Sequence, residues 1–147
     1  MNEPIRSVRV LLVEDDPGDA RLTLESLRDS KIRNSVVVLD DGAEVLPYLR
    51  REGEHAEALR PDLVLLDLNL PGRNGIEILA DIRDDEVLRS LPVVVLTTSA
   101  EERDIVASYA EHANAFVTKP IDLTQFGAVV TAIEDFWFEV VAYPHAD

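Results

Sequence analysis

Five short runs of aliphatic, mostly β-branched or leucine residues constrain the fold of this 147-residue chain more than any other feature. The runs are continuous and do not alternate apolar with polar residues. Such continuity is typical of strands that are buried on both faces of a parallel sheet. The predicted strands cover residues 8–13, 35–39, 62–66, 92–96 and 115–118.

Segments with helical spacing of apolar residues separate these runs. The helix markers, in chain order, are Ala20, Leu24 and Leu27; Val45, Leu46 and Leu49; Ile76, Leu79, Ala80 and Arg83; Ile105, Val106, Tyr109 and Ala110; and Phe126, Val130, Ile133, Trp137 and Val140. Parallel strands need crossover connections, and right-handed helical crossovers cover both faces of one sheet. The prediction is therefore an α/β fold, a doubly wound five-stranded parallel sheet of the flavodoxin-like (βα)5 type, with strand order 2-1-3-4-5.

Composition limits the classes of function. The length suits one domain, residues 1–147, with a core over about residues 8–138. The 29 acidic against 14 basic residues give a net charge of −15, which disfavours binding to nucleic acid or to anionic membranes. The absence of cysteine excludes thiol catalysis and Cys-ligated zinc. No apolar run is long enough for a membrane span and no signal peptide is evident, so a cytoplasmic location is expected.

The basic residues are unusual in kind. Lysine occurs twice, at Lys31 and Lys119, and arginine supplies the other twelve bases. Scarce lysine beside abundant acid is typical of proteins from extreme halophiles, where an acidic, hydrated surface keeps the chain in solution at high salt.

Residues that carry chemistry end the predicted strands. Glu14 and Asp15 follow the first strand and Asp67 the third, while Thr97 ends the fourth and Lys119 the fifth. The first and third strands are neighbours in the expected order, so their three carboxylates should converge at the switch point. Clustered carboxylates repel one another without a cation, and an oxygen-only ligand set suits Mg²⁺, with Mn²⁺ as the alternative. The pattern predicts a metal-assisted phosphoryl acceptor at Asp67, with Lys119 and Thr97 contacting the transferred group.

Each of these residues alone has a simpler interpretation. Asp16 before Pro17 is a helix N-cap, and Asp67 before a turn could be an ordinary exposed acid. Lys119 could be a surface lysine, and Thr97 a core hydroxyl with its hydrogen bond satisfied. Their coincidence at one end of one sheet favours the functional interpretation.

Four blocks of sequence resemble the receiver domain of two-component response regulators. They are LLVEDDP at 11–17, PDLVLLDLNLPGRNG at 61–75, PVVVLT at 92–97 and FVTKP at 116–120. The resemblance implies that a histidine kinase or phosphotransfer protein phosphorylates Asp67. It further implies that Asp15 and Asp67 bind Mg²⁺ directly, Glu14 through water, and Asn69 through its backbone carbonyl.

The resemblance also implies a switch. Thr97 and Phe116 would change position when Asp67 is phosphorylated, Lys119 would contact the phosphoryl group, and the face formed by the fourth helix, fifth strand and fifth helix would repack. The fifth helix carries a stripe that is either a dimer or partner face or simply core: Phe126, Val130, Ile133 and Trp137. Within the family, the chain is most similar to the stand-alone regulators associated with phytochrome-type kinases, from DPGDAR at 16–21, the long loop 50–61 and IEDFW at 133–137.

Three other functions are less favoured. A pseudo-receiver that binds partners without phosphorylation would not need the complete set of site residues. An aspartyl-nucleophile phosphatase would need an acid where Asn69 stands, and a flavodoxin-type cofactor site would need Ser, Thr or Gly where Glu14 and Asp15 stand. We therefore expect a signalling domain rather than an enzyme, with only self-phosphorylation and self-dephosphorylation chemistry. We expect no output domain to follow the fifth helix and the signal to leave through protein contacts.

Overall fold

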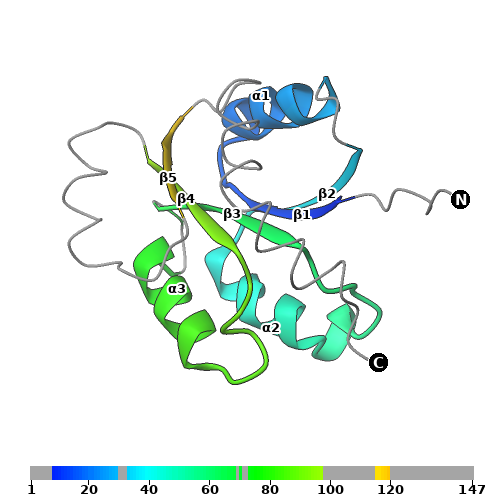
Figure 1. The fold of residues 1–147 in the computed structure, drawn as a ribbon, viewed down its shortest axis with the longest axis vertical. Helices are drawn as coiled ribbons and strands as arrows, with labels where there is room; N and C mark the ends of the chain where they lie inside the picture. Colours follow the sequence, from blue (N-terminus) through cyan, green and yellow to red (C-terminus); the bar gives the residue numbers. More distant parts are fainter. Residues whose placement is uncertain (1–7, 30–32, 69, 71–72, 98–114, 120–147) are drawn as a thin grey trace, which may run out of the picture.

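The computed structural model describes residues 8–29, 33–68, 70, 73–97 and 115–119 (Figure 1). Its elements are, in chain order, β1 (Val8–Val13), α1 (Pro17–Arg28), β2 (Asn34–Leu39), the 3-10 helix η1 (Gly42–Glu44), α2 (Val45–Arg50), the 3-10 helix η2 (Gly53–His55), β3 (Leu63–Asp67), α3 (Gly75–Asp84), β4 (Val93–Thr97) and β5 (Ala115–Thr118). The fourth and fifth predicted helices lie outside the described residues.

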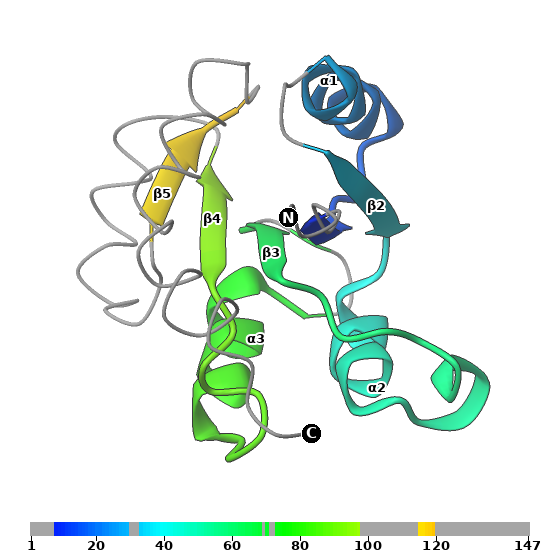
Figure 2. The ribbon, with the colours of Figure 1, turned by 45° about the vertical axis from the view of Figure 1, so that its right-hand side comes forward.

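The five strands form one parallel sheet in the order β2-β1-β3-β4-β5, which confirms the predicted topology. The helix α1 covers one face, and α2 and α3 cover the other (Figures 1 and 2). The register pairs Val13 with Leu66 and Asp67 with Leu96, so β1, β3 and β4 end at one edge of the sheet. We call this the carboxyl edge, and the opposite one the amino edge.

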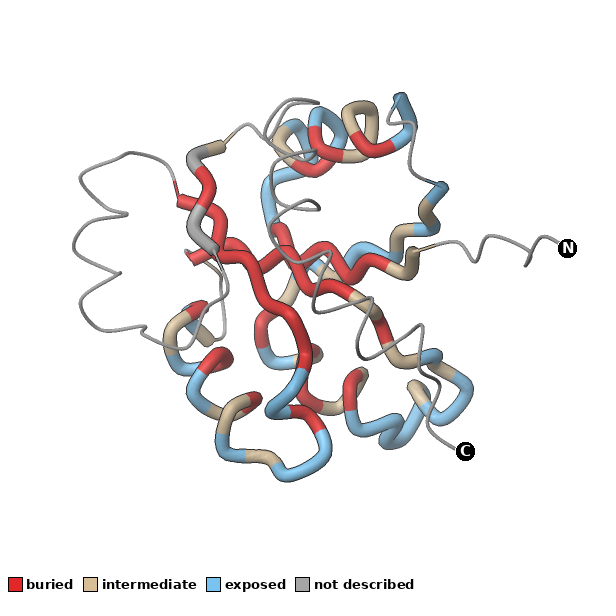
Figure 3. Tube along the Cα trace, in the orientation of Figure 1, coloured by how far each residue is buried: buried red, intermediate tan, exposed pale blue. Residues whose placement is uncertain are grey.

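Strand side chains point alternately into two separate cores. In β1, Leu11 and Val13 pack with α2 and α3, whereas Val10 and Leu12 pack with α1. Every residue of β3 and β4 is buried, as Figure 3 shows for the centre of the sheet. Full burial of each aliphatic side chain contributes about 1.5–3 kcal/mol relative to exposure. The continuous apolar runs of these two strands therefore match their position in the middle of the sheet.

Burial of β2 differs from the prediction. The run was expected to be buried on both faces, but Val37 and Val38 are 44% and 38% exposed. The strand pairs with β1 alone and ends the strand order, so neighbouring elements cover it less completely. A continuous apolar run therefore does not ensure burial on both faces when the strand is the outermost one of the sheet.

Helix boundaries follow local signals. Asp16 caps α1 as expected, with Pro17 in the first turn, and Asn74 and Glu77 form a capping box that begins α3. In α1 the predicted stripe is confirmed, because Ala20 and Leu27 are buried.

The buried stripe of α3 matches the prediction only in part. Of the predicted residues, Leu79 is buried, Ile76 and Arg83 are half-buried and Ala80 is exposed. Gly75, Ile78 and Ile82 complete the buried stripe. Gly75 packs so closely that a Cβ there would lie 2.8 Å from the carbonyl oxygen of Asp67. This close approach fixes the face that the helix turns to the sheet. Among the described residues, no helix is long and apolar enough to cross a membrane.

Candidate functional site

The backbone places four of the predicted site residues at the carboxyl edge. Glu14 directly follows β1, and its N–H donates to the carbonyl of Leu39 at 2.9 Å. Lys119 directly follows β5, and its N–H donates to the carbonyl of Thr97 at 2.7 Å. Asp67 is the last residue of β3. The hydrogen-bond ladder thus continues one residue past β1 and β5 and holds these side chains in register.

Lys119 lies at the centre of a group of carboxylates. Its Nζ is 3.2 Å from Glu14 Oε1, 3.0 Å from Asp19 Oδ2 and 3.2 Å from Asp67 Oδ2. Glu14 and Asp67 are each 1% exposed, and the Lys119 side chain is 10% exposed. One ammonium therefore connects β1, α1, β3 and β5 inside a largely water-excluded site.

Two of these carboxylates, together with Asp15, also have the spacing of a metal site. Glu14, Asp15 and Asp67 each offer an oxygen, and these three oxygens lie within 4.8 Å of one another. Glu14 and Asp67 are buried whereas Asp15 is exposed, so the group opens to solvent on one side. An oxygen-only donor set with an open side fits a hard divalent cation that keeps some of its waters, such as Mg²⁺ or Mn²⁺.

The electrostatics of this group favour an additional cation. Burial, together with the hydrogen bond and charge of Asp67, raises the pKa of Glu14 to about 7, although the Asp16 N–H and the charge of Lys119 oppose the shift. Burial alone would lower the pKa of Lys119, but the carboxylates of Asp19, Asp67 and Glu14 outweigh it and raise that pKa. Lys119 therefore stays protonated at neutral pH. The surrounding acids exceed it in charge, and without a cation their charge is costly to bury.

Two neighbouring acids have distinct roles. Asp16 accepts hydrogen bonds from the N–H groups of Gly18 and Asp19 at 2.8 and 3.0 Å, so it is a helix cap, as expected, and not part of the metal group. Asp19 was not predicted as a site residue, although it contacts Lys119. Its signal in the sequence is its position three residues after the cap, in the first turn of α1, where an acid also favours the helix dipole.

The remaining predicted residues are placed in part. Thr97 ends β4, is fully buried and interacts through its backbone with Lys119. Phe116 lies in β5 opposite Val95, but its side chain is not described. Asn69 and the apolar stripe of the fifth predicted helix lie outside the described residues. The stripe consists of Phe126, Val130, Ile133 and Trp137.

Comparison with known proteins agrees with this geometry. Residues 10–131 match the family model described as the response regulator receiver domain. The chain is 44% identical over 137 residues to the response regulator Rcp1 of a Synechocystis species, covering 93% of each protein. A structure of Mn²⁺-bound Rcp1 superposes with a TM-score of 0.71 over 94% of this chain and 99% of that one.

Two further structures extend the similarity. The bacteriophytochrome response regulator RtBRR is 47% identical, with a TM-score of 0.80 over 87% of this chain and 78% of that one. The phosphorylated cyanobacterial phytochrome response regulator RcpA is 48% identical, with a TM-score of 0.73 over 90% of this chain and 95% of that one. The predicted similarity to phytochrome-associated regulators is confirmed, and this chain belongs to the response regulator receiver domain family.

Proposed function

We propose that this chain is a phosphorelay response regulator that accepts a phosphoryl group on Asp67. The observation that carries the proposal is the buried Asp67 carboxylate, which lies 3.2 Å from the ammonium of Lys119 and within the metal-ligand group of Glu14 and Asp15. The donor is a histidine kinase or phosphotransfer protein. A carboxylate oxygen of Asp67 forms a bond to phosphorus as the phosphorus–nitrogen bond of a phosphohistidine breaks.

The cation site uses the group already described. Asp15 and Asp67 hold Mg²⁺ or Mn²⁺ directly, Glu14 holds it through water, and the Asn69 carbonyl completes the protein ligands. When bound, the cation neutralises negative charge on the oxygens of the transferred group. The Mn²⁺-bound structure of Rcp1, a 44% identical protein, supports a divalent cation as the ligand of this group.

Two side chains of the protein contact the phosphoryl group. Lys119 keeps its positive charge and pairs with a phosphoryl oxygen, and burial strengthens this interaction because water does not screen it. The Thr97 hydroxyl donates to another phosphoryl oxygen once the group is present. The phosphorylated structure of RcpA, a 48% identical regulator, supports the proposal that this chain is phosphorylated.

The output is a change of surface rather than catalysis on another substrate. Movement of Thr97 toward the phosphoryl group and of Phe116 into the vacated space repacks the face formed by the fourth predicted helix, β5 and the fifth predicted helix, which carries the apolar stripe. The stripe then serves as the dimer or partner face. Replacing Thr97 with Ala should leave phosphorylation intact and abolish the change at this face.

Phosphorylation by a small-molecule donor tests the acceptor. We expect wild type with Mg²⁺ and acetyl phosphate to gain the mass of one phosphoryl group, and Asp67→Asn to gain none. Asp84→Asn, an exposed acid-to-amide change at the end of α3, is the matched control and should gain mass like wild type. Equal labelling of Asp67→Asn, or no labelling of wild type, would overturn the proposal.

A further inference from the structure

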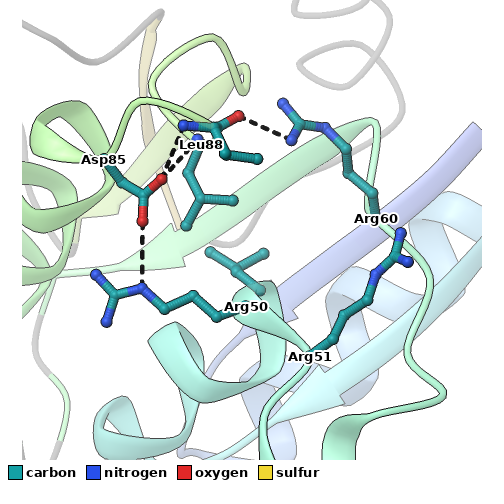
Figure 4. Close-up of a pocket in the computed structure, with 7 residues that line it drawn as sticks. Arg50, Arg51, Arg60, Asp85 and Leu88 are labelled. Carbon is teal, nitrogen blue, oxygen red and sulfur yellow. Dashed lines mark hydrogen bonds and ion pairs between the residues drawn. The ribbon is translucent and has the colours of Figure 1, made fainter. Parts of the chain in front are cut away.

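A cavity of about 300 Å³ opens at the amino edge of the sheet, the end opposite Asp67. Figure 4 shows residues that line it. The residues around it come from the end of α2, the segment that leads into β3, and the segment between α3 and β4. They are Leu49, Arg50, Arg51, Arg60, Asp85, Val87 and Leu88. Three of these seven residues are arginines, in a chain whose net charge is −15.

The one acid among these lining residues is already engaged. Asp85 accepts from Arg50 Nε at 3.2 Å and from the N–H groups of Val87 and Leu88 at 2.8 and 3.2 Å. In Figure 4, Arg50 extends toward Asp85 and Arg60 toward the backbone next to Leu88, whereas Arg51 lies on the side of the cavity away from Asp85. The Arg51 guanidinium therefore has no carboxylate partner among the lining residues, and the hydrogen bonds of Arg60 go to uncharged oxygens.

Arg60 is held in place by hydrogen bonds before any ligand arrives, whereas only the backbone of Arg51 is. Arg60 donates to the carbonyl of Val87 at 2.9 Å and to Ser90 Oγ at 3.3 Å. Arg51 ends α2 in the left-handed region, with φ of 57°, where helices usually have glycine or asparagine. Its N–H donates to the carbonyl of Tyr48, while its guanidinium makes no hydrogen bond or ion pair within the described part of the chain. Burial lowers the pKa of Arg60, and the neighbouring charge of Arg51 lowers it further, although Asp62 and Asp85 oppose this.

We propose that this cavity binds a small phosphate monoester with an apolar body. A monoester carries nearly two negative charges at neutral pH, which matches the guanidiniums of Arg51 and Arg60, neither of which forms an ion pair within the described part of the chain, and arginine binds phosphate oxygens in pairs. Leu49, Val87 and Leu88 supply an apolar surface beside the arginines. The chain's net charge of −15 disfavours a polyanion such as nucleic acid and favours a ligand small enough to enter the cavity.

Titration with phenyl phosphate tests the proposal. The 147-residue protein is used in chelator and low salt, so that the acid cluster holds no cation, and binding is followed by calorimetry. We expect saturable binding that is tighter for phenyl phosphate than for inorganic phosphate and absent for phenol. Equal affinity for phenyl phosphate and inorganic phosphate would contradict the apolar part of the proposal.

Two variants distinguish binding at this cavity from non-specific attraction of the ligand to arginines. Arg51→Gln should weaken binding on the order of tenfold, because a charge-assisted pair is lost. Arg28→Gln, an exposed arginine at the end of α1, should change it by less than about twofold. No saturable binding to wild type, or equal weakening by both variants, would overturn the site. Asp67→Asn should bind like wild type, so this test stands independently of the phosphoacceptor proposal.

Discussion

The two edges of the sheet carry similar arrangements with opposite charge. At the carboxyl edge, Glu14, Asp15 and Asp67 cluster beside the ammonium of Lys119. At the amino edge, three arginines and one acid line a cavity, and the acid, Asp85, pairs with Arg50. The difference is burial. Glu14 and Asp67 are 1% exposed, whereas the Arg50 side chain is 43% exposed. Changes in charge should therefore have large effects on stability at the carboxyl edge and small ones at the amino edge, where water screens them.

The largest expected effect is at Lys119. Lys119→Met leaves Glu14 and Asp67 buried beside each other with no countercharge. In chelator, we expect the free energy of unfolding, measured by urea denaturation, to fall by about 3–5 kcal/mol. The matched change Arg28→Met at an exposed position should cost less than about 0.5 kcal/mol. A loss below about 1 kcal/mol for Lys119→Met would mean that water reaches the carboxyl edge freely.

The pH dependence of stability sharpens the same contrast. The folded pKa of Glu14, about 7, lies above its ordinary value of 4.5, so between these values the folded state binds more protons than the unfolded state. Stability of the metal-free protein should therefore be greatest below about pH 4.5, as far as this group is concerned, and should fall as pH rises to 7. The loss should be at most about 3 kcal/mol.

Glu14→Gln should flatten this profile. Urea titrations at pH 5 and pH 7.5 in chelator check it, with Glu25→Gln on the exposed side of α1 as control. If the free energy of unfolding changes equally between pH 5 and pH 7.5 in wild type and in Glu14→Gln, the pKa of Glu14 is not raised in the folded state.

Binding of a divalent cation should offset the unfavourable energy of burying carboxylates at the carboxyl edge. At a Mg²⁺ concentration about 100 times the Kd, the free energy of unfolding should rise by about 2.7 kcal/mol. Asp15→Asn should reduce that gain, while Asp84→Asn should keep it. If the two variants gain equally, Asp15 is not a ligand.

The smallest expected effect is at the amino edge. Arg51→Gln removes a charge that lies near Arg60 and has no partner within the described part of the chain, so stability should change by no more than about 0.5 kcal/mol. Urea denaturation without ligand checks this. A fall in the free energy of unfolding of more than about 2 kcal/mol would mean that Arg51 stabilises the fold and is not reserved for ligand binding.

The two edges also differ in how far the sequence predicts them. Glu14, Asp67, Thr97 and Lys119 each end or directly follow an apolar run, so once the strand order is known their convergence follows. Asp19 was missed because it comes from a helix, where its approach to Lys119 depends on the crossing of α1 over the sheet.

The amino-edge cavity could not be predicted for the same reason. Arg51, Arg60 and Asp85 lie in helix ends and connecting segments, whose paths are set by tertiary packing rather than by a periodic pattern. The exposure of Val37 and Val38 in β2 likewise depends on a strand's neighbours, which composition does not encode.

Chemical trapping of the modified residue tests the central claim most directly. An aspartyl phosphate is reduced by borohydride to homoserine, which peptide mass spectrometry locates in the sequence. After incubation with acetyl phosphate and Mg²⁺, the account predicts homoserine at position 67, with none when the metal is chelated. Homoserine at another acid, or none at all, would contradict it.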